Sequence, residues 1–502
     1  MIYGPVVGLE IHAELKTKTK MFCFSLNDPD EKHPNINICP ICMGHPGTLP
    51  VINEEAVKKV IKVGLALHGE ILEFSQFDRK NYFYPDLPKG YQISQYQHPL
   101  VKGGYLEILG RKIRITRVHL EEDTGRLIHD RGTGVSLVDF NRAGVPLMEL
   151  VTEPDFRTGE EVKKFGEELQ KILRYVEASD ADMEKGQMRV EVNISLTTTE
   201  GLRQFEESFG QPDSHGESGL GTKVEIKNIN SFKFAEDAVN YEVRRQTGLL
   251  ERGEKVAQET RGWDENKEET FSQRSKEEAH DYRYFPEPDL PPLNLSREFV
   301  EEIRASLPEL PQAKYARFQE EFKLEPDIVS IITRDKSLAG YFEAVASELL
   351  RHDKDTPEKP KKNPIKTAAA FIVGDFLWVL DKLSADVSDT RVTPENFAEL
   401  MIYVAEDKIS NLAAKEVLEE MARTGEDPTG IVEKKGLWQM SNLADLEDIT
   451  KHIVKENSGT VEDYKKGKKQ ALQFLVGQVM KETRGKANPK VVQEILNKIL
   501  KD

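Results

Sequence analysis

The sequence opens with a stretch in which ionisable side chains occupy every second position. Residues 7–15 read VGLEIHAEL, so that Glu10, His12 and Glu14 alternate with apolar residues. Because successive side chains of a β-strand point to opposite faces, this alternation predicts a strand with one apolar face and one face of carboxylates and an imidazole. Two interpretations follow: such a face is solvated, as in many half-buried strands, or it holds a metal ion or a phosphate group.

Further carboxylates lie in three other strand-like stretches. They are Glu121, Glu122 and Asp123 in HLEED, Glu149, Glu153 and Asp155 in PLMELVTEPD, and Glu191 in RVEVNIS. A face that gathers several carboxylates is unfavourable unless a cation neutralises it, and oxygen ligands suit Mg²⁺. Imidazole suits transition metals better, so His12 would bind a second cation or orient a water molecule. The chain has neither a GxxxxGK[ST] phosphate loop nor a GxGxxG after a strand, so a nucleotide site would be of another type.

The three cysteines suggest a second site. Cys39 and Cys42 form a CxxC pair, and Cys23 precedes them in the same short region. An odd number of clustered cysteines argues against a disulfide framework and for a metal-binding loop. A closed structural zinc site has four ligands, so His33 or a water molecule would have to complete the set. The alternative is a degenerate site with buried, reduced thiols.

The length of 502 residues predicts about three domains, at a prior of ~150 residues each. Residues 1–292 alternate like strands, with two helices: one capped by Asn53 and one opened by a capping box of Thr158 and Glu161. These patterns predict an α+β fold with an antiparallel sheet. Helical periodicity continues from Ser296, and Thr393 caps one helix ahead of Pro394. We therefore predict a β-rich domain over 1–292, an all-helical domain over 293–425 and a small helical tail domain over 426–502.

Charge and hydropathy limit the class of protein. The net charge of −17 argues against a chain coated with basic residues for nucleic acid, but 9 basic and 4 acidic residues lie within 455–490. This local excess is either a phosphate-binding surface or a solvated helical face. No apolar run has the ~20 residues that a membrane span needs, and the first residues do not resemble a signal peptide. We expect a cytoplasmic protein.

Long stretches of the chain resemble one family. They are GLEIHAEL, CPICMGHPGTLPVIN, RKNYFYPDLPKGYQISQY, HLEEDTGR, DFNRAGVPLMELVTEPDFRT, GTKVEIKNINSF and DYRYFPEPDLPP, followed by KISNLAAKEVLEEM, DPTGIVEKKGLWQMS and VEDYKKGKKQALQFLVGQVMKETRGKANPK. In this order they are similar to the B subunit of the tRNA-dependent amidotransferase, which acts on glutamyl-tRNA(Gln) and aspartyl-tRNA(Asn). The resemblance spans nearly the whole chain.

The resemblance implies a β-rich cradle domain, a helical domain and a tail domain that holds the tRNA. It implies a carbon–nitrogen ligase, with glutamine as the amido donor, in a heterotrimer. The B subunit uses ATP and Mg²⁺ to phosphorylate the side-chain carboxylate of the misacylated amino acid. Ammonia released by an amidase-type A subunit travels through a tunnel and displaces the phosphate, and a small C subunit stabilises the complex. An acyl phosphate is a far better acyl donor than a carboxylate, and phosphoryl transfer depends chiefly on positioning and charge neutralisation.

Carried over residue by residue, the resemblance assigns functions to several side chains. The metal and phosphoryl site would comprise Glu10, His12, Glu121, Glu122 and Glu149, with Glu191 as a further catalytic residue at a position where the family commonly has Asp. Lys223, Glu225 and Lys227 would contact phosphates or complete the metal shell. Cys23, Cys39 and Cys42 would hold zinc, and the tRNA-binding residues would be Lys465, Lys466, Lys468, Lys469, Arg484 and Lys486.

Two departures from the family pattern stand out. Many members have C-x-C before CPxC, whereas this chain has Cys23-Phe24-Ser25, so one thiolate is missing. The stretch from Thr197 to Gly221 is longer than usual and rich in Gly and Ser, which predicts a surface loop. Two other functions stay open: a non-catalytic scaffold that binds tRNA within the same complex, and a metal-dependent phosphohydrolase that turns over nucleotide without aminoacyl-tRNA.

Overall fold

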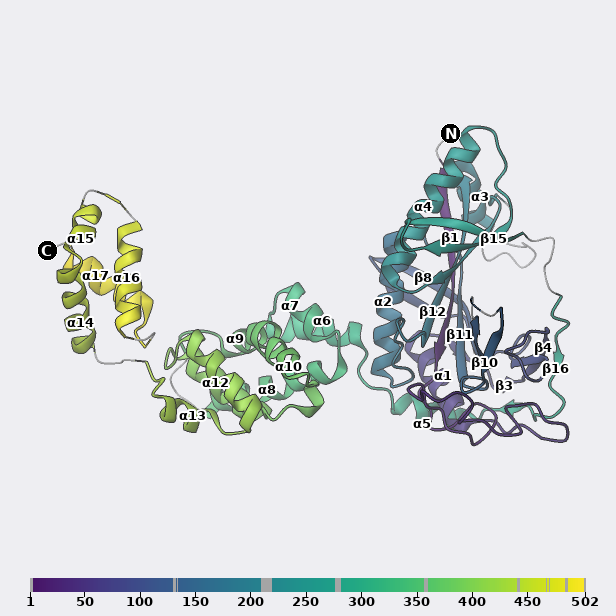
Figure 1. Cartoon of the computed structure of the whole chain (residues 1–502), viewed down its shortest axis with the longest axis horizontal. Helices are drawn as coiled ribbons and strands as arrows, with labels where there is room; N and C mark the ends of the chain where they lie inside the picture. The colour runs from purple at the N-terminus through teal and green to yellow at the C-terminus, as the bar shows by residue number, and fades with distance from the viewer. Residues whose placement is uncertain are drawn as a thin grey trace. The chain divides into compact units, whose positions relative to one another are not determined.

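The computed structural model describes residues 3–129, 132, 134–208, 219–275, 281–355, 360–439, 443–465, 467–468, 470–483 and 486–500. The chain divides into two compact units, Met1–Leu310 and Pro311–Asp502 (Figure 1). The first unit combines a large sheet with helices, and the described elements of the second are helical, so the predicted α+β class is confirmed. None of the described helices is both long enough and apolar enough to cross a membrane.

One large sheet dominates the first unit. Its strand order is β15-β14-β13-β12-β1-β11-β8-β6-β2, with β7 paired to β8. The strands are β1 (Tyr3–Glu14), β2 (Glu70–Ile71), β6 (Val101–Lys102), β7 (Tyr105–Ile108), β8 (Arg111–Glu122), β11 (Pro146–Thr152), β12 (Met188–Thr198), β13 (Val224–Ile229), β14 (Glu259–Asp264) and β15 (Glu269–Ser275). The long strand β1 lies in the interior of this sheet, between β11 and β12.

The sheet differs from the predicted antiparallel one at a single pairing among the described strands. β13 and β14 run parallel, whereas the other described pairings are antiparallel. The helix α4 (Phe232–Glu251) follows β13 and precedes β14. Parallel neighbours need such a crossover connection, and α4 supplies it. The sheet is therefore mixed.

Three smaller sheets complete the strands of the first unit. β4 (Asp78–Asn81) lies between β5 (Tyr91–Ser94) and β16 (Phe285–Pro286). β9 (Arg126–His129) pairs with β10 (Ser136–Asp139), and β3 (Phe74–Ser75) pairs with β17 (Leu293–Asn294). Two of these sheets join segments that lie far apart in the sequence, because β16 and β17 pair with strands some 200 residues earlier.

The helices of the first unit confirm some sequence predictions and correct others. Asn53 caps α1 (Glu54–Ala66), and Thr158 and Glu161 form the predicted capping box of α2 (Gly159–Tyr175). Only two helices were expected before Ser296, which is wrong because α3 (Thr199–Ser208) and α4 also form. α3 occupies part of the predicted surface loop, whose residues 209–218 lie outside the described ones. Figure 1 shows α2 and α4 beside each other on the sheet, where α4 contacts α2, β12 and β15.

Helices build the described part of the second unit. They are α6 (Pro311–Phe322), α7 (Pro326–Ile332), α8 (Lys336–Asp355), α9 (Pro364–Phe371), α10 (Leu377–Leu383), α11 (Pro394–Ala405), α12 (Asn411–Thr424), α13 (Pro428–Lys435), α14 (Leu443–Glu456), α15 (Ser458–Lys465), α16 (Gln470–Glu482) and α17 (Pro489–Ile499), with a π-helical turn at Ile372–Phe376 and a 3₁₀ turn at Val387–Asp389. Thr393 caps α11 as predicted. Apolar side chains gather in two clusters, one over residues 318–432 and one over 446–500. The division into separate domains at 292/293 and 425/426 stays a prediction. The first unit, which includes α5 (Arg297–Ala305), has its own core.

Candidate functional site

Strand β1 is the centre of the candidate site, because its two neighbours bring ionisable side chains to the same face. His12 lies opposite Glu149 of β11, and Glu149 in turn lies opposite His119 of β8. On the other side, Glu10 lies opposite Glu191 of β12. Residues paired across strands share a face of the sheet. The register thus aligns two imidazoles and three carboxylates on one face, while Leu9 and Ile11 are buried on the other.

The side chains of this face lie close enough to share a cation. We call Glu10, His12, His119, Glu121 and Glu149 the His–Glu cluster. Nε2 of His12 lies 3.7 Å from Glu10, 3.6 Å from Glu121 and 3.5 Å from Glu149. Nε2 of His119 lies 3.5 Å from Glu149 and 3.9 Å from Glu121. Ser94 of β5 donates a hydrogen bond of 3.1 Å to Glu121. The structure therefore brings Glu10, His12, Glu121 and Glu149 together, as the sequence predicted.

The two imidazoles of the cluster have opposite electrostatic environments. Burial lowers the pKa of His12, but the hydrogen bond to Glu149 and the charges of Glu121, Glu149 and Glu10 outweigh burial and raise the pKa to about 9. Burial lowers the pKa of His119 to about 4, and the charge of Glu149 offsets that only in part. At neutral pH His12 is accordingly protonated and His119 is neutral. A neutral imidazole is the form that binds a metal ion.

The carboxylates of the cluster are also unequal. Burial and the nearby charges of Glu149 and Glu191 raise the pKa of Glu10 to about 7. Burial and Glu149 raise the pKa of Glu121 as well. The pKa of Glu149 lies below its ordinary value, because His119, His12 and Lys80 together outweigh the effect of burial. Glu149 is thus the carboxylate that stays ionised, and it contacts both imidazoles.

Sequence reasoning missed three members of this environment. His119 is buried and belongs to HLEED. It precedes Glu121 by two residues, and because residues two apart in a strand share a face, this spacing could have predicted its place in the cluster. Arg117, two residues further back, lies 3.6 Å from Glu149. Lys80 comes from β4, a strand of another sheet, so no local pattern pointed to it. Burial lowers the pKa of Lys80, but Glu121 and Glu149 raise it above its ordinary value, so Lys80 is a cation beside the cluster.

The donor set fits a divalent cation. One ligand atom from each of Glu10, His12 and Glu149 lies within 4.8 Å of the others, and the same holds for His119, Glu121 and Glu149. Carboxylate oxygens suit Mg²⁺, and a mixed set of carboxylate and imidazole also suits Mn²⁺ and its neighbours. In the protonated form of His12, the proton occupies the nitrogen that would bind the cation. The cluster can therefore exchange a proton for a metal ion.

Glu122 and Glu14 lie apart from the His–Glu cluster. Glu122 follows Glu121 in β8 and so points to the opposite face, where Lys89 pairs with it at 2.7 Å and the backbone N–H of Ile93 donates to it at 3.0 Å. A cavity of about 210 Å³ lies there, lined by Glu122 and by Cys42. Glu14 shares the face of His12, but burial and the neighbouring Asp123 raise its pKa to about 8. The structure does not place Glu122 with the predicted metal ligands.

The remaining predicted site residues lie beside Glu10. Lys227 of β13 contacts Glu191 at 2.9 Å and Glu225 at 3.6 Å, so one ammonium group neutralises two carboxylates. Glu225 also accepts a hydrogen bond of 2.8 Å from Thr260 of β14. Lys223 is exposed and directly precedes β13. Glu191 and Lys227 therefore extend the polar face, while Lys223 lies outside it.

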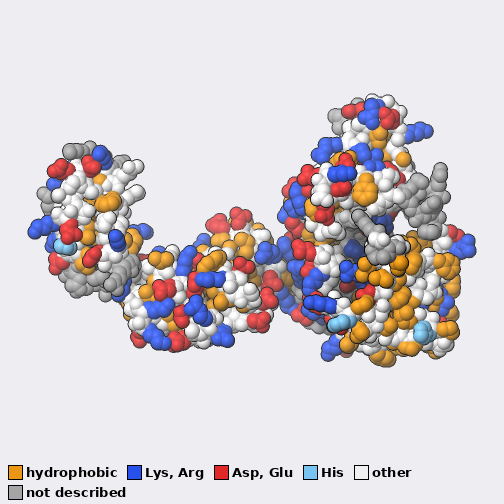
Figure 2. Space-filling view, in the orientation of Figure 1, with side chains coloured by type: hydrophobic (Ala, Val, Ile, Leu, Met, Phe, Trp, Pro, Cys, Tyr) orange, Lys and Arg blue, Asp and Glu red, His pale blue; other side chains and the backbone are white. Residues whose placement is uncertain are grey.

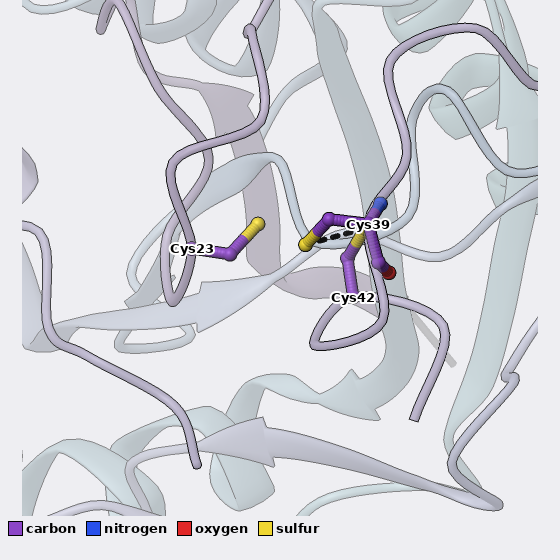
Figure 3. Close-up of side chains that lie close together, drawn as sticks. All are labelled: Cys23, Cys39 and Cys42. Carbon is purple, nitrogen blue, oxygen red and sulfur yellow. Dashed lines mark hydrogen bonds between the residues drawn. The ribbon is translucent and has the colours of Figure 1, made fainter. Parts of the chain in front are cut away.

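The cysteines form the second predicted cluster. Figure 3 shows that the three sulfur atoms turn toward one another from two separate loops, and they lie within 4.8 Å of each other. Hydrogen bonding by Cys23 lowers the pKa of Cys42 to about 4, against the effect of burial, and the Lys20 ammonium adds to this lowering. Three sulfurs with a stabilised thiolate fit Zn²⁺. His33 is not part of the group, because its exposed ring contacts Glu31 at 2.9 Å.

The predicted tRNA-binding residues are only partly described. Lys466, Lys469 and Arg484 lie outside the described residues. Lys465 is exposed at the end of α15, and Lys468 pairs with Asp463 at 3.0 Å. Lys486 is half-buried between α16 and α17. Lys465 is thus the described member whose side chain is most available to a phosphate.

Comparison with known proteins identifies the family of this chain. Residues 5–301 match the family described as the GatB/GatE catalytic domain, and residues 358–500 match the GatB domain. The chain is 46% identical over 501 residues to the B subunit of the aspartyl/glutamyl-tRNA(Asn/Gln) amidotransferase of Carboxydothermus hydrogenoformans, covering 98% of each chain. It is 46% identical to the protein of that name from Persephonella marina, with full coverage of both chains, and 45% identical to that of Thermotoga maritima, covering 100% of this chain and 99% of the other. The chain therefore belongs to the family of aspartyl/glutamyl-tRNA(Asn/Gln) amidotransferase B subunits.

Proposed function

We propose that this chain activates the side-chain carboxylate of glutamate on tRNA(Gln), of aspartate on tRNA(Asn), or of both, as the B subunit of a glutamine-dependent amidotransferase in the cytoplasm. The γ-phosphoryl group of ATP passes to the carboxylate and ADP leaves. Ammonia then attacks the acyl phosphate, phosphate leaves, and the amide forms. An amidase-type A subunit would release the ammonia from glutamine, and a small C subunit would complete the heterotrimer. The His–Glu cluster on β1, β8 and β11 carries this proposal.

The described side chains suit the charge changes of phosphoryl transfer. Mg²⁺ held by Glu10, His12, Glu121 and Glu149 would, when bound, neutralise phosphate oxygens. Lys80 and Arg117 lie beside the same carboxylates and would direct positive charge at the transferring group. Glu191, Glu225 and Lys227 would orient the substrate at the edge of the cluster. Because the acyl phosphate is prone to hydrolysis, burial of the cluster also serves to exclude water.

The two remaining sites would support assembly and tRNA binding. Zn²⁺ on Cys23, Cys39 and Cys42 would hold two loops together beside the first unit's sheet. The basic residues of the tail domain, 426–502, would contact tRNA phosphates. We place Lys465, Lys466, Lys468, Lys469, Arg484 and Lys486 in this role. They would contribute to affinity rather than to chemistry.

The test is an amidation assay that bypasses the glutaminase. The chain is purified with its A and C partners and given glutamyl-tRNA(Gln), ATP, Mg²⁺ and ammonium chloride. We expect the unmodified complex to form glutaminyl-tRNA and Glu149→Gln to lose at least 100-fold in rate. Glu70→Gln, which changes an exposed glutamate of β2, is the matched control and should keep full activity.

Each alternative function gives a different result in this assay. If Glu149→Gln and His12→Ala amidate normally, the chain is a tRNA-binding scaffold and the chemistry lies on a partner. If ADP forms at the same rate without aminoacyl-tRNA and no amide appears, the chain is a phosphohydrolase. Filter binding of tRNA to each variant separates lost chemistry from lost affinity.

A further inference from the structure

A group of tyrosines lies beside the His–Glu cluster and has no part in the chemistry proposed above. We call Tyr82, Tyr96, Tyr282 and Tyr284 the tyrosine platform. The rings of Tyr96 and Tyr284 stack with centroids 4.3 Å apart and planes 7° from parallel. Tyr282 packs edge-on, 5.8 Å from Tyr82 and 6.1 Å from Tyr284. The platform joins two segments that are about 200 residues apart in the sequence.

Backbone contacts fix the platform in place. Asn81 donates its backbone N–H to the carbonyl of Tyr282 at 2.9 Å and its side-chain amide to that of Arg283 at 2.9 Å. The buried carboxylate of Asp78 accepts a hydrogen bond of 3.0 Å from the backbone N–H of Tyr96. Phe285 pairs with Arg79 in the β16–β4 ladder. Because the chain makes these contacts with itself, the rings are already held in position to receive a ligand.

Lys80 connects the platform to the His–Glu cluster. Its ammonium group lies 5.1 Å from the centre of the Tyr282 ring. The charges of Glu121 and Glu149 act on the same ammonium group. They also contribute, after burial, to raising the pKa of Tyr284 to about 12. Ser94, two residues before Tyr96, donates a hydrogen bond of 3.1 Å to Glu121. The platform and the cluster are therefore neighbours.

The outer side of the platform faces solvent. Tyr96 is 51% exposed, and the nearby Phe83 is 93% exposed. Figure 2 shows hydrophobic side chains over the part of the first unit where Figure 1 places β3, β4 and β16. Exposed aromatic rings next to a lysine are the arrangement by which proteins stack unpaired nucleic-acid bases. An enclosed pocket, in contrast, is the usual site of a free small molecule.

We propose that the tyrosine platform stacks the base of the 3′-terminal adenosine of the aminoacyl-tRNA. This inference rests on the proposed function, because a carboxylate activated at the His–Glu cluster hangs from the ribose of that nucleotide. Only the ribose and an ester separate the base from the reacting amino acid, so the base must lie close to the cluster. Tyr96 and Tyr284 lie there, and their exposed side suits the end of a polymer that approaches from solvent.

The experiment follows the terminal base directly. tRNA(Gln) is prepared with 2-aminopurine, whose fluorescence is quenched by stacking, as its 3′-terminal base, and is titrated with the full-length chain. We expect quenching with the unmodified chain. Tyr96→Ala should abolish the quenching and weaken binding of the terminal base about 5- to 100-fold. Tyr96→Phe keeps the ring and is the matched control, which should quench like the unmodified chain. Circular dichroism checks that each variant is folded.

Four results, besides an unaltered KM for aminoacyl-tRNA in Tyr96→Ala, would overturn the proposal. The first is full quenching by both Tyr96→Ala and the double variant Tyr96→Ala/Tyr284→Ala. The second is a rise in the KM for ATP while the 2-aminopurine signal persists, which would assign the rings to the adenine of ATP. The third is loss of the A subunit from the purified complex of Tyr96→Ala, which would make this face a protein interface. The fourth is loss of the signal in Tyr96→Phe.

The readout also separates this inference from the proposed function. Quenching requires neither ATP nor chemistry. If the chain quenches the 2-aminopurine fluorescence but its complex does not form the amide, the proposed function is refuted and base stacking is not. A complex that amidates with an unaltered KM for aminoacyl-tRNA in Tyr96→Ala would refute base stacking alone.

Discussion

His12 and His119 approach the same oxygen of Glu149, each with its Nε2 at 3.5 Å, from strands on either side of β11. One carboxylate thus lies between a protonated and a neutral imidazole. The charges of three carboxylates stabilise the proton on His12, which occupies the nitrogen that would bind a cation. Metal binding and protonation must therefore compete at this position.

The competition predicts that metal affinity depends on pH. The pKa of His12 is raised from 6.5 to about 9, so below pH 9 a metal ion must displace a proton. The apparent association constant of Mn²⁺ should rise about tenfold per pH unit between pH 7 and 8, rise more steeply below pH 7, where Glu10 is protonated as well, and level off above pH 9. Calorimetry in buffers of different ionisation enthalpy would count the released proton. An affinity that does not change with pH would contradict this.

The same shift affects stability in the absence of metal. A group whose pKa is raised on folding stabilises the protein below its unfolded pKa, and this contribution is lost as the pH rises through the folded value. For His12 the loss falls between pH 6.5 and about 9. His12→Asn should therefore show a smaller drop in unfolding midpoint over this window than the unmodified chain, measured by urea titration with EDTA present. Equal drops in both proteins would exclude His12 as the cause.

We expect His119 to contribute to metal binding, although the sequence analysis singled out only the acidic residues of its motif HLEED. We expect His119→Ala to lower Mn²⁺ affinity about 10- to 100-fold, because a buried imidazole that contacts Glu121 and Glu149 would be removed. Electron paramagnetic resonance of free Mn²⁺ measures this without any turnover. His68→Ala, at an imidazole that stacks on Tyr105 away from the cluster, provides the comparison and should bind Mn²⁺ normally.

Ser25, which stands where many family members have a cysteine, allows a test of the cysteine site. Its Oγ lies 3.9 Å from Sγ of Cys42, so Ser25→Cys would bring a fourth thiolate to the three-sulfur group. Because structural zinc favours four ligands, the zinc affinity should rise at least tenfold, measured by competition with a chromophoric chelator. Ser25→Ala should not raise it. Equal affinities in all three proteins would show that position 25 lies outside the coordination sphere.

Packing between α2 and α4 predicts a difference between two glycines of the first unit. A Cβ at Gly166 would lie 2.4 Å from the ring of Phe232, so Gly166→Ala should lower the free energy of unfolding by about 1–3 kcal/mol. At Gly248 in α4 a Cβ would meet only the end of Arg252, at 3.6 Å, and Gly248→Ala should raise it by about 0.5–1 kcal/mol. Urea unfolding followed by circular dichroism compares the two. A stabilising Gly166→Ala would show that the helices can separate.

Local patterns in the sequence accounted for part of the site. Alternation in β1 placed Glu10 and His12 on one face, and the caps at Asn53 and Thr158 placed the starts of α1 and α2. The sequence analysis placed Glu121 and Glu122 in one metal site because they belong to one motif. Neighbouring residues of a strand point to opposite faces, so only one of the two can join the cluster. The helix α4 was missed because tertiary contacts with α2, β12 and β15 support it.

Lys80 shows what no local pattern could supply. It lies on a four-residue strand, and its proximity to Glu121 depends on how one small sheet packs against the large one. The tyrosine platform has the same origin, because Tyr96 and Tyr284 meet only after the chain returns from residue 285 to β4. Contacts of this kind follow from the completed fold rather than from the residues beside them.

The place of β1 in the sheet has a consequence for biosynthesis. β1 is made before the other described strands, yet its hydrogen-bonding partners β11 and β12 are more than 130 residues away, as the pairs His12–Glu149 and Glu10–Glu191 show. Contacts this distant slow folding, because a long loop must close before they form. While the ribosome makes the intervening residues, β1 has no strand to pair with and its apolar side is uncovered, which leaves it open to aggregation. The His–Glu cluster is therefore complete only after residue 149 has left the ribosome, and its acidic face cannot capture metal ions before then.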